Sequence, residues 1–258
     1  MAVYGVLGDI HGNKEALAAV LRALAARGVR DILCVGDVVG YNADPDECVR
    51  LLRDRGAACI AGNHDLIALG RLGFERCSNK ARYSLQRTRR SLAPDSMAWL
   101  AAQPAARLVD DAIVLIHGGA RDVQLYMRTP EHIRQNAALV LEDFPHARIC
   151  LFGHSHEQRL FEVRPQGVAE VAAPGEGVRL SRESIHFINP GAVDGQRKRA
   201  SRQAECAIFD SGRWTLEFLS VPYDWAATEA RARAGGYRIG ALADLAYSLR
   251  RRAARLLG

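Results

Sequence analysis

Short apolar runs that end abruptly at polar tips occur five times along this chain. The runs are VYGVLG at 3–8, ILCVG at 32–36, ACIAG at 58–62, AIVLI at 112–116 and ICLFG at 149–153. Runs of this length that end close to glycine predict buried strands. Ligands usually bind at the carboxyl ends of strands in an α/β sheet. We therefore expect the polar tips to gather at one edge of a sheet.

The segments between the first three runs have the pattern of helices. Asn13 is placed to cap a helix that ends near Gly28, and Asp44-Pro45 predicts the start of a second helix that stops at Gly56. An alternation of strands and helices predicts parallel strands that are joined by right-handed crossovers. The first 70 residues therefore predict a β-α-β-α-β unit.

The rest of the chain changes from helices to strands. Residues 64–104 have a helical pattern, with helices at 78–92 and 94–99, and a further helix is expected at 130–141. A hairpin is expected at 107–117, with its turn at Asp110-Asp111. Further strands are predicted at 159–163, 167–171, 184–188, 206–210 and 215–219. A parallel half followed by a strand-rich half predicts an α/β fold, an α+β sandwich of two packed mixed β-sheets flanked by helices. Without repeats or linkers, we expect a single domain over 1–258, in which 225–258 forms a C-terminal helical tail with a break at Gly235-Gly236.

Composition narrows the class of protein. The 258 residues are 48% hydrophobic and contain neither an early apolar run of 18 residues nor a leader pattern, so we expect a cytoplasmic protein with no membrane partner. The six cysteines are scattered without a CxxC pair, which favours reduced thiols in the core over disulfides or a zinc site. The net charge of +6 suits an anionic substrate. Binding of nucleic acid through the basic tail is an alternative that rests on charge alone.

The polar tips are rich in residue types that bind metal ions. Asp9 and His11 are two residues apart, and in extended geometry both side chains point to the same side. Asp37 follows its strand alone, where one carboxylate can bridge two cations. Each motif alone is as typical of a cap or turn, but the combination predicts a two-metal hydrolytic site. Nitrogen and oxygen ligands together favour Mn, Fe, Zn, Ni or Co over Ca or Mg. The candidate ligands are Asp9, His11, Asp37, Asn63, His117, His154 and His156.

The order of the motifs resembles that of the calcineurin-like metallophosphoesterase superfamily. The motifs are GDIHGN, GDVVGYNADP, GNHD, HGG and GHSH, followed by INPGAV at 188–193. GDVVGYNADPDEC with INPGA is similar to the small bacterial phosphodiesterase-like branch. The resemblance implies a binuclear metal-dependent phosphoesterase, which hydrolyses phosphodiester or nucleotide-type phosphate bonds by attack of metal-bound hydroxide. The alternatives are a metal-dependent phosphomonoesterase or protein phosphatase, and a non-catalytic scaffold on the same fold.

The resemblance also implies a role for each candidate residue. Two divalent transition-metal ions, with manganese favoured, would be the cofactors. His64 would be catalytic rather than a ligand, and would face the scissile phosphate to stabilise the transition state or protonate the leaving oxygen. The first ion would be held by Asp9, His11 and His156, the second by Asn63, His117 and His154, and Asp37 would bridge them.

One position departs from the pattern of the superfamily. Many of its phosphatases carry an aspartate three residues after the bridging aspartate, where it orients the catalytic histidine. Here that position is Gly40. Either Asp65 or Asp44 takes over the role of that aspartate, or no residue does.

The substrate is expected to be a small phosphate ester or a nucleotide. Arg121 and Arg197 are candidate substrate-binding residues, because arginine is well shaped for bidentate contact with phosphate. The alternative for each is a plain surface charge. Asp194 follows the INPGAV segment, and we expect it to face solvent, as most aspartates do.

Overall fold

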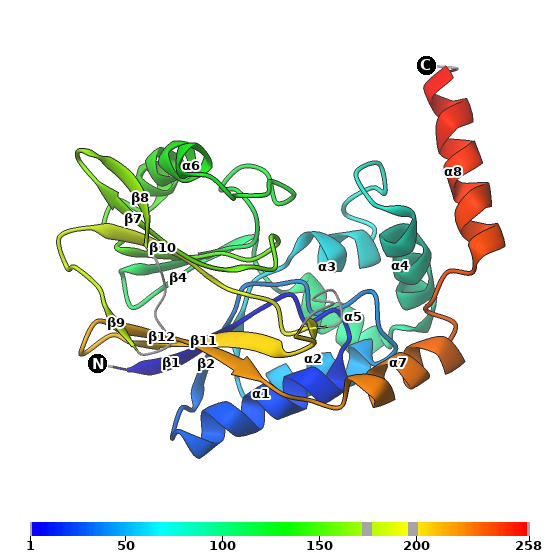
Figure 1. Ribbon diagram of the computed structural model, residues 1–258, viewed down its shortest axis with the longest axis horizontal. Coiled ribbons are helices and arrows are strands. Elements are labelled where there is room, and N and C mark those ends of the chain that lie inside the picture. The colour runs from blue at the N-terminus through cyan, green and yellow to red at the C-terminus, as the bar shows by residue number, and fades with distance from the viewer. Residues whose placement is uncertain (1, 172–176, 196–200, 257–258) are drawn as a thin grey trace.

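Two six-stranded β-sheets form the centre of the molecule (Figure 1). The computed structural model describes residues 2–171, 177–195 and 201–256. The first sheet has the order β3-β2-β1-β11-β12-β9, with β1 at Val3–Leu7, β2 at Asp31–Cys34, β3 at Ala58–Cys59, β9 at Val178–Arg179, β11 at Ala204–Asp210 and β12 at Thr215–Val221. The second has the order β4-β5-β6-β10-β7-β8, with β4 at Ala106–Val109, β5 at Ile113–Ile116, β6 at Ile149–Leu151, β7 at Gln158–Arg164, β8 at Gly167–Val171 and β10 at Ile185–Pro190.

Both sheets are mixed, as the sequence predicts. Strands β1, β2 and β3 run parallel, and so do β5, β6 and β10. The remaining pairs, β1 with β11 among them, are antiparallel. Asp110 and Asp111 both have positive φ at the turn of the β4–β5 hairpin, which suits a type I′ turn. The parallel strands direct the carboxyl ends of β1–β3 and of β5–β6 towards the same edge of the sandwich.

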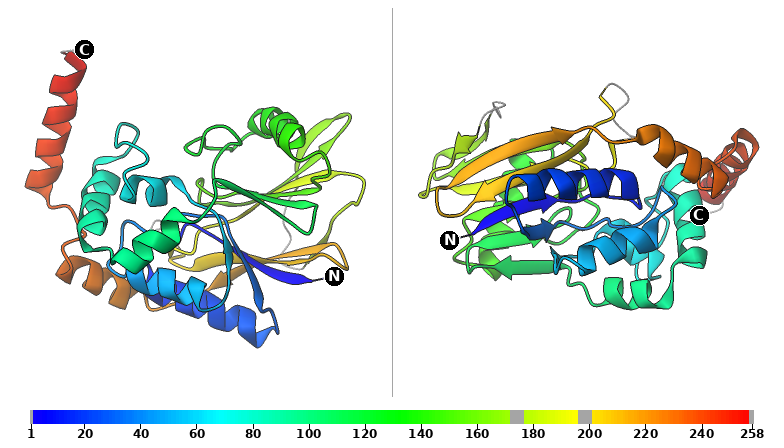
Figure 2. Two further views of the ribbon diagram at one scale, coloured as in Figure 1. Left: turned by 180° about the vertical axis from the view of Figure 1, so that it is seen from behind. Right: turned by 90° about the horizontal axis from the view of Figure 1, so that it is seen from below.

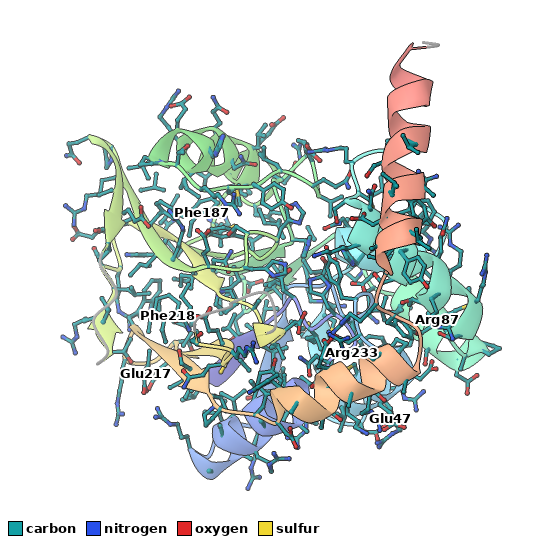
Figure 3. All side chains as sticks on the ribbon, turned by 45° about the vertical axis from the view of Figure 1, so that its right-hand side comes forward. Glu47, Arg87, Phe187, Glu217, Phe218 and Arg233 are labelled. Carbon is teal, nitrogen blue, oxygen red and sulfur yellow. The ribbon has the colours of Figure 1, made fainter. Side chains whose placement is uncertain are left out.

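Helices cover both outer faces of the pair of sheets. Helix α1 packs on β11 and β12 on one side, and α6 packs on β7 and β8 on the other (Figures 1 and 2). The C-terminal α8 leads away from the sheets and contacts α4. Arg87 of α4 and Arg233 of α7 mark this helical part of the molecule in Figure 3. The helices are α1 at Lys14–Ala26, α2 at Pro45–Arg53, α3 at Asn63–Ala68, α4 at Asn79–Ser91, α5 at Pro94–Ala101, α6 at Pro130–Asp143, α7 at Trp225–Ala234 and α8 at Ala241–Leu256.

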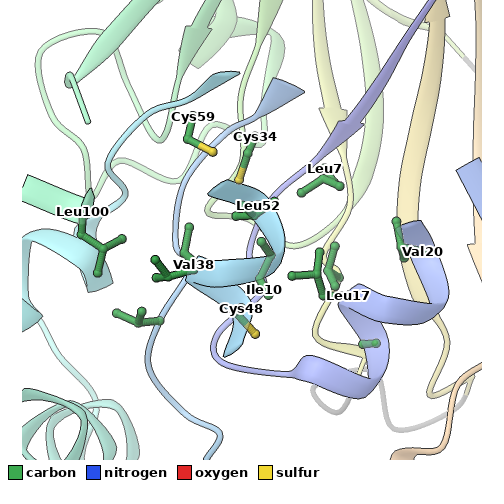
Figure 4. Close-up of a cluster of buried hydrophobic side chains, with 14 of the residues drawn as sticks. Leu7, Ile10, Leu17, Val20, Cys34, Val38, Cys48, Leu52, Cys59 and Leu100 are labelled. Atoms are coloured by element: carbon green, nitrogen blue, oxygen red, sulfur yellow. The ribbon is translucent and has the colours of Figure 1, made fainter. Parts of the chain in front are cut away.

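Three apolar clusters fill the spaces between these layers. Val6 and Leu151, from opposite sheets, belong to the cluster between the sheets. Leu17 and Leu52 belong to the cluster under α1 and α2, which Figure 4 shows. Phe187 lies under α6 in the third cluster. Burial of one leucine or phenylalanine side chain contributes about 1.5–3 kcal/mol to the free energy of unfolding. Packing of the three clusters therefore holds the strands, and with them the strand ends, in fixed positions.

Local signals in the sequence agree with most of the element boundaries. The Asn13 side chain accepts a hydrogen bond from the backbone N–H of Ala16 and caps α1, as expected. Asp44 occupies the cap position of α2, but its carboxylate pairs with Arg231 of α7 instead of capping the helix. The predicted helical stretch of 64–104 is interrupted between α3 and α4, and the tail breaks between α7 and α8.

The sequence also predicts reduced, buried cysteines and no membrane-spanning segment. All six cysteines are free thiols and buried, as expected. In the described ranges of the chain, every helix is too short or too polar to cross a bilayer.

Candidate metal centre

Hydrogen bonds tie the ends of the parallel strands together. The backbone N–H of Asp9 donates to the carbonyl of Gly36 at 3.0 Å, which links the loops after β1 and β2. The N–H of Gly153 donates to the carbonyl of His117 at 2.8 Å, which links the loops after β6 and β5. The N–H of His154 donates to Asp9 Oδ2 at 3.0 Å and joins the two sheets. The predicted tips therefore meet at one edge, and each of the eight residues is at most 9% exposed: Asp9, His11, Asp37, Asn63, His64, His117, His154 and His156.

The backbone reaches this arrangement through left-handed turns rather than extended strands. Positive φ is uncommon for residues other than glycine and concentrates at functional sites, where the surrounding structure maintains the strain. The expectation that Asp9 and His11 share an extended segment is therefore wrong, since their φ angles are 49° and 53°. Five of the seven candidate ligands have this conformation: Asp9, His11, Asp37, His154 and His156.

The donor atoms form three groups in which all atoms lie within 4.8 Å of one another. In the first group, His156 Nε2 lies 3.2 Å from Asp9 Oδ1 and 3.2 Å from His11 Nε2. The second group contains Asp37, His117 and His154, and the third contains His11, Asp37 and His64. Each group combines one carboxylate with two imidazoles, a donor set that suits a divalent transition metal.

Asp37 belongs to the second group and also lies close to His11 of the first group. Its Oδ2 atom is 3.8 Å from His11 Nε2 and 3.4 Å from His117 Nε2. Its other oxygen, Oδ1, accepts a hydrogen bond from the backbone N–H of His64 at 2.7 Å. A β-carbon at Gly62 would lie 2.2 Å from Oδ1, so the backbone passes too close for any side chain at that position. The carboxylate is therefore fixed in place, with one oxygen directed at both groups.

The charges of the buried carboxylates follow from the imidazoles around them. Burial acts to raise the pKa of Asp37, but His117, His64 and His11 outweigh it and hold that pKa well below the usual range. Burial likewise acts to raise the pKa of Asp9, and His156 and His117 lower it below its ordinary value. Both side chains are therefore carboxylates, the form that binds cations.

The histidines differ in their protonation. Burial lowers the pKa of His11 well below its usual range, and His64 adds to this effect. Burial and His117 lower the pKa of His154 to about 4, so both rings are neutral and able to coordinate. Burial acts to lower the pKa of His117, but Asp37 and Asp9 raise it to about 10. A cation bound between these groups would take the place of that proton, so the residues fit a divalent ion.

Outer hydrogen bonds orient the candidate ligands. His117 Nδ1 lies 2.7 Å from the carbonyl of Val35, which leaves its Nε2 facing Asn63 Oδ1 at 3.0 Å. His154 Nε2 lies 3.2 Å from the carbonyl of Gln124. Partners of this kind fix the tautomer and the direction of a metal-binding imidazole.

A cavity of about 190 Å³ opens over these groups. Its lining includes Asp37, Asn63, His64, His154 and His156 from the strand ends, and Tyr41, Arg76, Cys77, Ser78, Ala81, Gln124 and Tyr126 from the surrounding loops and α4. The cavity is large enough for a phosphoryl group and part of its substituent.

His64 occupies the space where a side chain at position 40 would lie. A β-carbon at Gly40 would come within 2.4 Å of His64 Nδ1, and the φ of this glycine is +102°. The Tyr41 ring lies 4.7 Å from the His64 ring, and the His11 ring lies 4.5 Å from it. The packing of the His64 imidazole therefore leaves no room for a carboxylate side chain at position 40.

Both alternative carboxylates have partners of their own. Asp65 accepts hydrogen bonds from the backbone N–H groups of Gly62 and Val39, at 2.9 Å and 3.1 Å. Asp44 forms an ion pair with Arg231. Both are thus engaged in holding loops and helices together.

Among the residues that the structure describes, neither predicted substrate-binding arginine lines the cavity. Arg121 is half-exposed and pairs with Glu142 and Asp143 at the surface. Arg197 lies outside the described residues. The expectation that Asp194 faces solvent is wrong, because it is 2% exposed and accepts a hydrogen bond from Asn13 Nδ2 at 2.8 Å.

Arg76 is a residue of the cavity wall that the sequence reasoning did not find. It lies in the irregular segment between α3 and α4. That segment has neither apolar periodicity nor a motif, so the sequence offers no signal for Arg76 beyond an arginine near a predicted site.

Comparisons with known proteins agree with this geometry. Residues 3–158 match the family model described as calcineurin-like phosphoesterase. A metallophosphoesterase from Sphaerobacter thermophilus is 29% identical, with a TM-score of 0.72, and the match covers 91% of this chain and 94% of that one. A hypothetical protein from Pyrococcus horikoshii OT3 has the same fold at 16% identity, with a TM-score of 0.69 over 92% and 95% of the two chains.

A relative known from its sequence extends the comparison. An uncharacterized protein from Methanocaldococcus jannaschii is 27% identical over 227 residues, which is 86% of this chain and 88% of the relative. The family model covers more than half of the chain, including the tips after β1, β2, β3, β5 and β6. The chain belongs to the calcineurin-like phosphoesterase family and is a hydrolase with candidate ligands for divalent metal ions.

Proposed function

We propose that this protein hydrolyses phosphodiester or nucleotide-type phosphate bonds at a centre of two divalent metal ions. The observation that carries the proposal is the position of Asp37 Oδ2, 3.8 Å from His11 Nε2 and 3.4 Å from His117 Nε2. One carboxylate oxygen close to both His11 and His117 is well placed to contact two adjacent cations. Manganese is the favoured ion, with iron, zinc, nickel or cobalt as alternatives.

Each side chain has one task in this proposal. Bound cations would polarise the phosphoryl oxygens and lower the pKa of water. The first ion would be held by Asp9, His11 and His156, the second by Asn63, His117 and His154, and Asp37 would contact both. The supporting hydrogen bonds of His117 and His154 keep these rings in place before any ion binds.

His64 is the proposed acid of the reaction. Its ring lines the cavity beside Tyr41, and its backbone is tied to Asp37 Oδ1. From that position the imidazole is expected to stabilise charge on the phosphoryl group or to give a proton to the departing oxygen. The third donor group also contains His64, so metal content must be measured to separate an acid from a ligand.

The test is hydrolysis of bis(p-nitrophenyl) phosphate by metal-free protein before and after addition of Mn²⁺. We expect release of p-nitrophenolate only with added metal and its loss on chelation. Parallel assays with p-nitrophenyl phosphate compare the diester with the monoester. The proposal fails if the metal-free protein retains full activity, or if neither ester is hydrolysed with any of the five metals.

A glycine-to-alanine change tests the packing of His64. Gly40→Ala is expected to lower kcat about tenfold to a hundredfold, because the new β-carbon would displace a group whose placement within about 1 Å matters. The matched control is Gly56→Ala. Gly56 also has positive φ, at +62° against +102° for Gly40, but a β-carbon there meets no atom within 4 Å, so this variant places an alanine in a left-handed conformation without touching His64. Equal activity of the two variants would contradict the role given to this packing.

A further inference from the structure

Arg76 stands apart among the side chains that line the cavity. It provides the only cationic side chain among the described residues of the lining, apart from the histidines. It comes from the irregular segment between α3 and α4. Its side chain is 52% exposed, so a ligand in the cavity can reach it.

The guanidinium is held in one orientation by two groups of the segment after β5. Nη1 donates to both carboxylate oxygens of Asp122, at 2.9 Å and 2.8 Å, and Nη2 donates to the carbonyl of Gln124 at 2.8 Å. A guanidinium has five N–H groups, and these three hydrogen bonds do not use them all. Since orientation is already fixed, little further entropy is lost when a second anion binds.

The same carbonyl links Arg76 to the candidate metal ligands. His154 Nε2 lies 3.2 Å from the carbonyl of Gln124, and Arg76 Nη2 lies 2.8 Å from it. The two nitrogens are therefore at most about 6 Å apart. A phosphoryl group at the strand ends and a second anionic group next to it would span this distance.

The ion pair between Arg76 and Asp122 is expected to contribute little to the stability of the fold. The Arg76–Asp122 pair is half-exposed on both sides, at 52% and 44%, and exposed ion pairs contribute little to folding. The guanidinium is placed at the cavity and aligned there, which is what recognition of a substrate requires.

We propose that Arg76 binds a second anionic group of the substrate, so that the enzyme prefers phosphoesters with a further phosphate or carboxylate near the scissile phosphate. This inference rests on the proposed function and names its substrate class. Asp122 and the carbonyl of Gln124 position the guanidinium. Charge-assisted hydrogen bonds of this kind predict a preference of about tenfold to a hundredfold for the more anionic substrate.

The experiment compares two chromogenic diesters that differ in one carboxylate. They are phenyl p-nitrophenyl phosphate and 4-carboxyphenyl p-nitrophenyl phosphate, assayed with Mn²⁺. Wild-type protein is expected to have a KM about tenfold or more lower for the carboxylate ester, with similar kcat. Arg76→Ala is expected to remove that difference, and Arg76→Lys to restore part of it. Arg134→Ala is the control, because Arg134 is exposed, pairs with Glu131 on α6 and lies outside the lining.

A purely structural role would give a different result. If Arg76 only joined the two loops, Arg76→Ala would change both esters by the same factor, and the proposal would be overturned. Competitive binding of phenylphosphonate and 4-carboxyphenylphosphonate, measured by calorimetry, gives a readout without turnover. The carboxylate should improve binding to wild type and not to Arg76→Ala. If neither ester is hydrolysed, the proposed function is refuted. The calorimetry would still test the role of Arg76 in that case.

Discussion

Asp37→Asn is expected to lower kcat/KM for bis(p-nitrophenyl) phosphate by about a thousandfold or more. The change removes the charge shared by both ligand groups, and metal ions contribute several kcal/mol to stabilising such a transition state. The amide oxygen of asparagine can still accept the hydrogen bond that Asp37 Oδ1 receives from the backbone N–H of His64. The fold should therefore survive, and the variant should bind fewer metal ions per chain.

The measurement combines steady-state kinetics with metal analysis and circular dichroism. Asp143→Asn is the matched control, since Asp143 is an exposed aspartate that pairs with Arg121 outside the cavity. Its activity is expected to stay within about twofold of wild type, as for most surface changes. An Asp37→Asn protein that kept a tenth of wild-type activity would exclude the bridging role.

His64→Gln is expected to lower kcat about a hundredfold to ten-thousandfold, the range for loss of a general acid. The metal content should not change, because the proposal makes His64 an acid and not a ligand. The loss should be larger for an alkyl leaving group than for p-nitrophenolate, since a poor leaving group depends more on protonation. Kinetics with both kinds of ester and metal analysis provide the check.

The control for this variant is His146→Gln, at an exposed histidine between α6 and β6 that lies outside the lining of the cavity. Loss of one metal equivalent in His64→Gln would instead assign His64 to the third donor group, with His11 and Asp37. Equal losses for good and poor leaving groups would argue against proton donation.

The sequence predicted the parts of the site that depend on local pattern. Each tip follows a strand of apolar residues, and the order of parallel strands decides which tips meet. Asp9 and Asp37 could therefore be placed at one edge without knowledge of the turns between them. The left-handed φ of these residues was not predictable, because the strain is maintained by contacts from distant loops.

The wall of the cavity depends on contacts between segments far apart in the chain. Arg76 and Asp122 are 46 residues apart, and neither lies in a periodic element. Asp194 is buried because Asn13, 181 residues away, donates to it. Asp44 pairs with Arg231 instead of capping α2. Such pairings form only in the packed fold. Composition and spacing describe residues that are close in the sequence, so they do not predict these contacts.

The number of metal ions bound at equilibrium tests the central claim most directly. Metal-free protein would be titrated with Mn²⁺, and bound metal and hydrolysis of bis(p-nitrophenyl) phosphate would be followed in the same samples. The account predicts two ions per chain, with full activity only when both are bound, and about one or none in Asp37→Asn. Full activity with one ion per chain, or without metal, would contradict it.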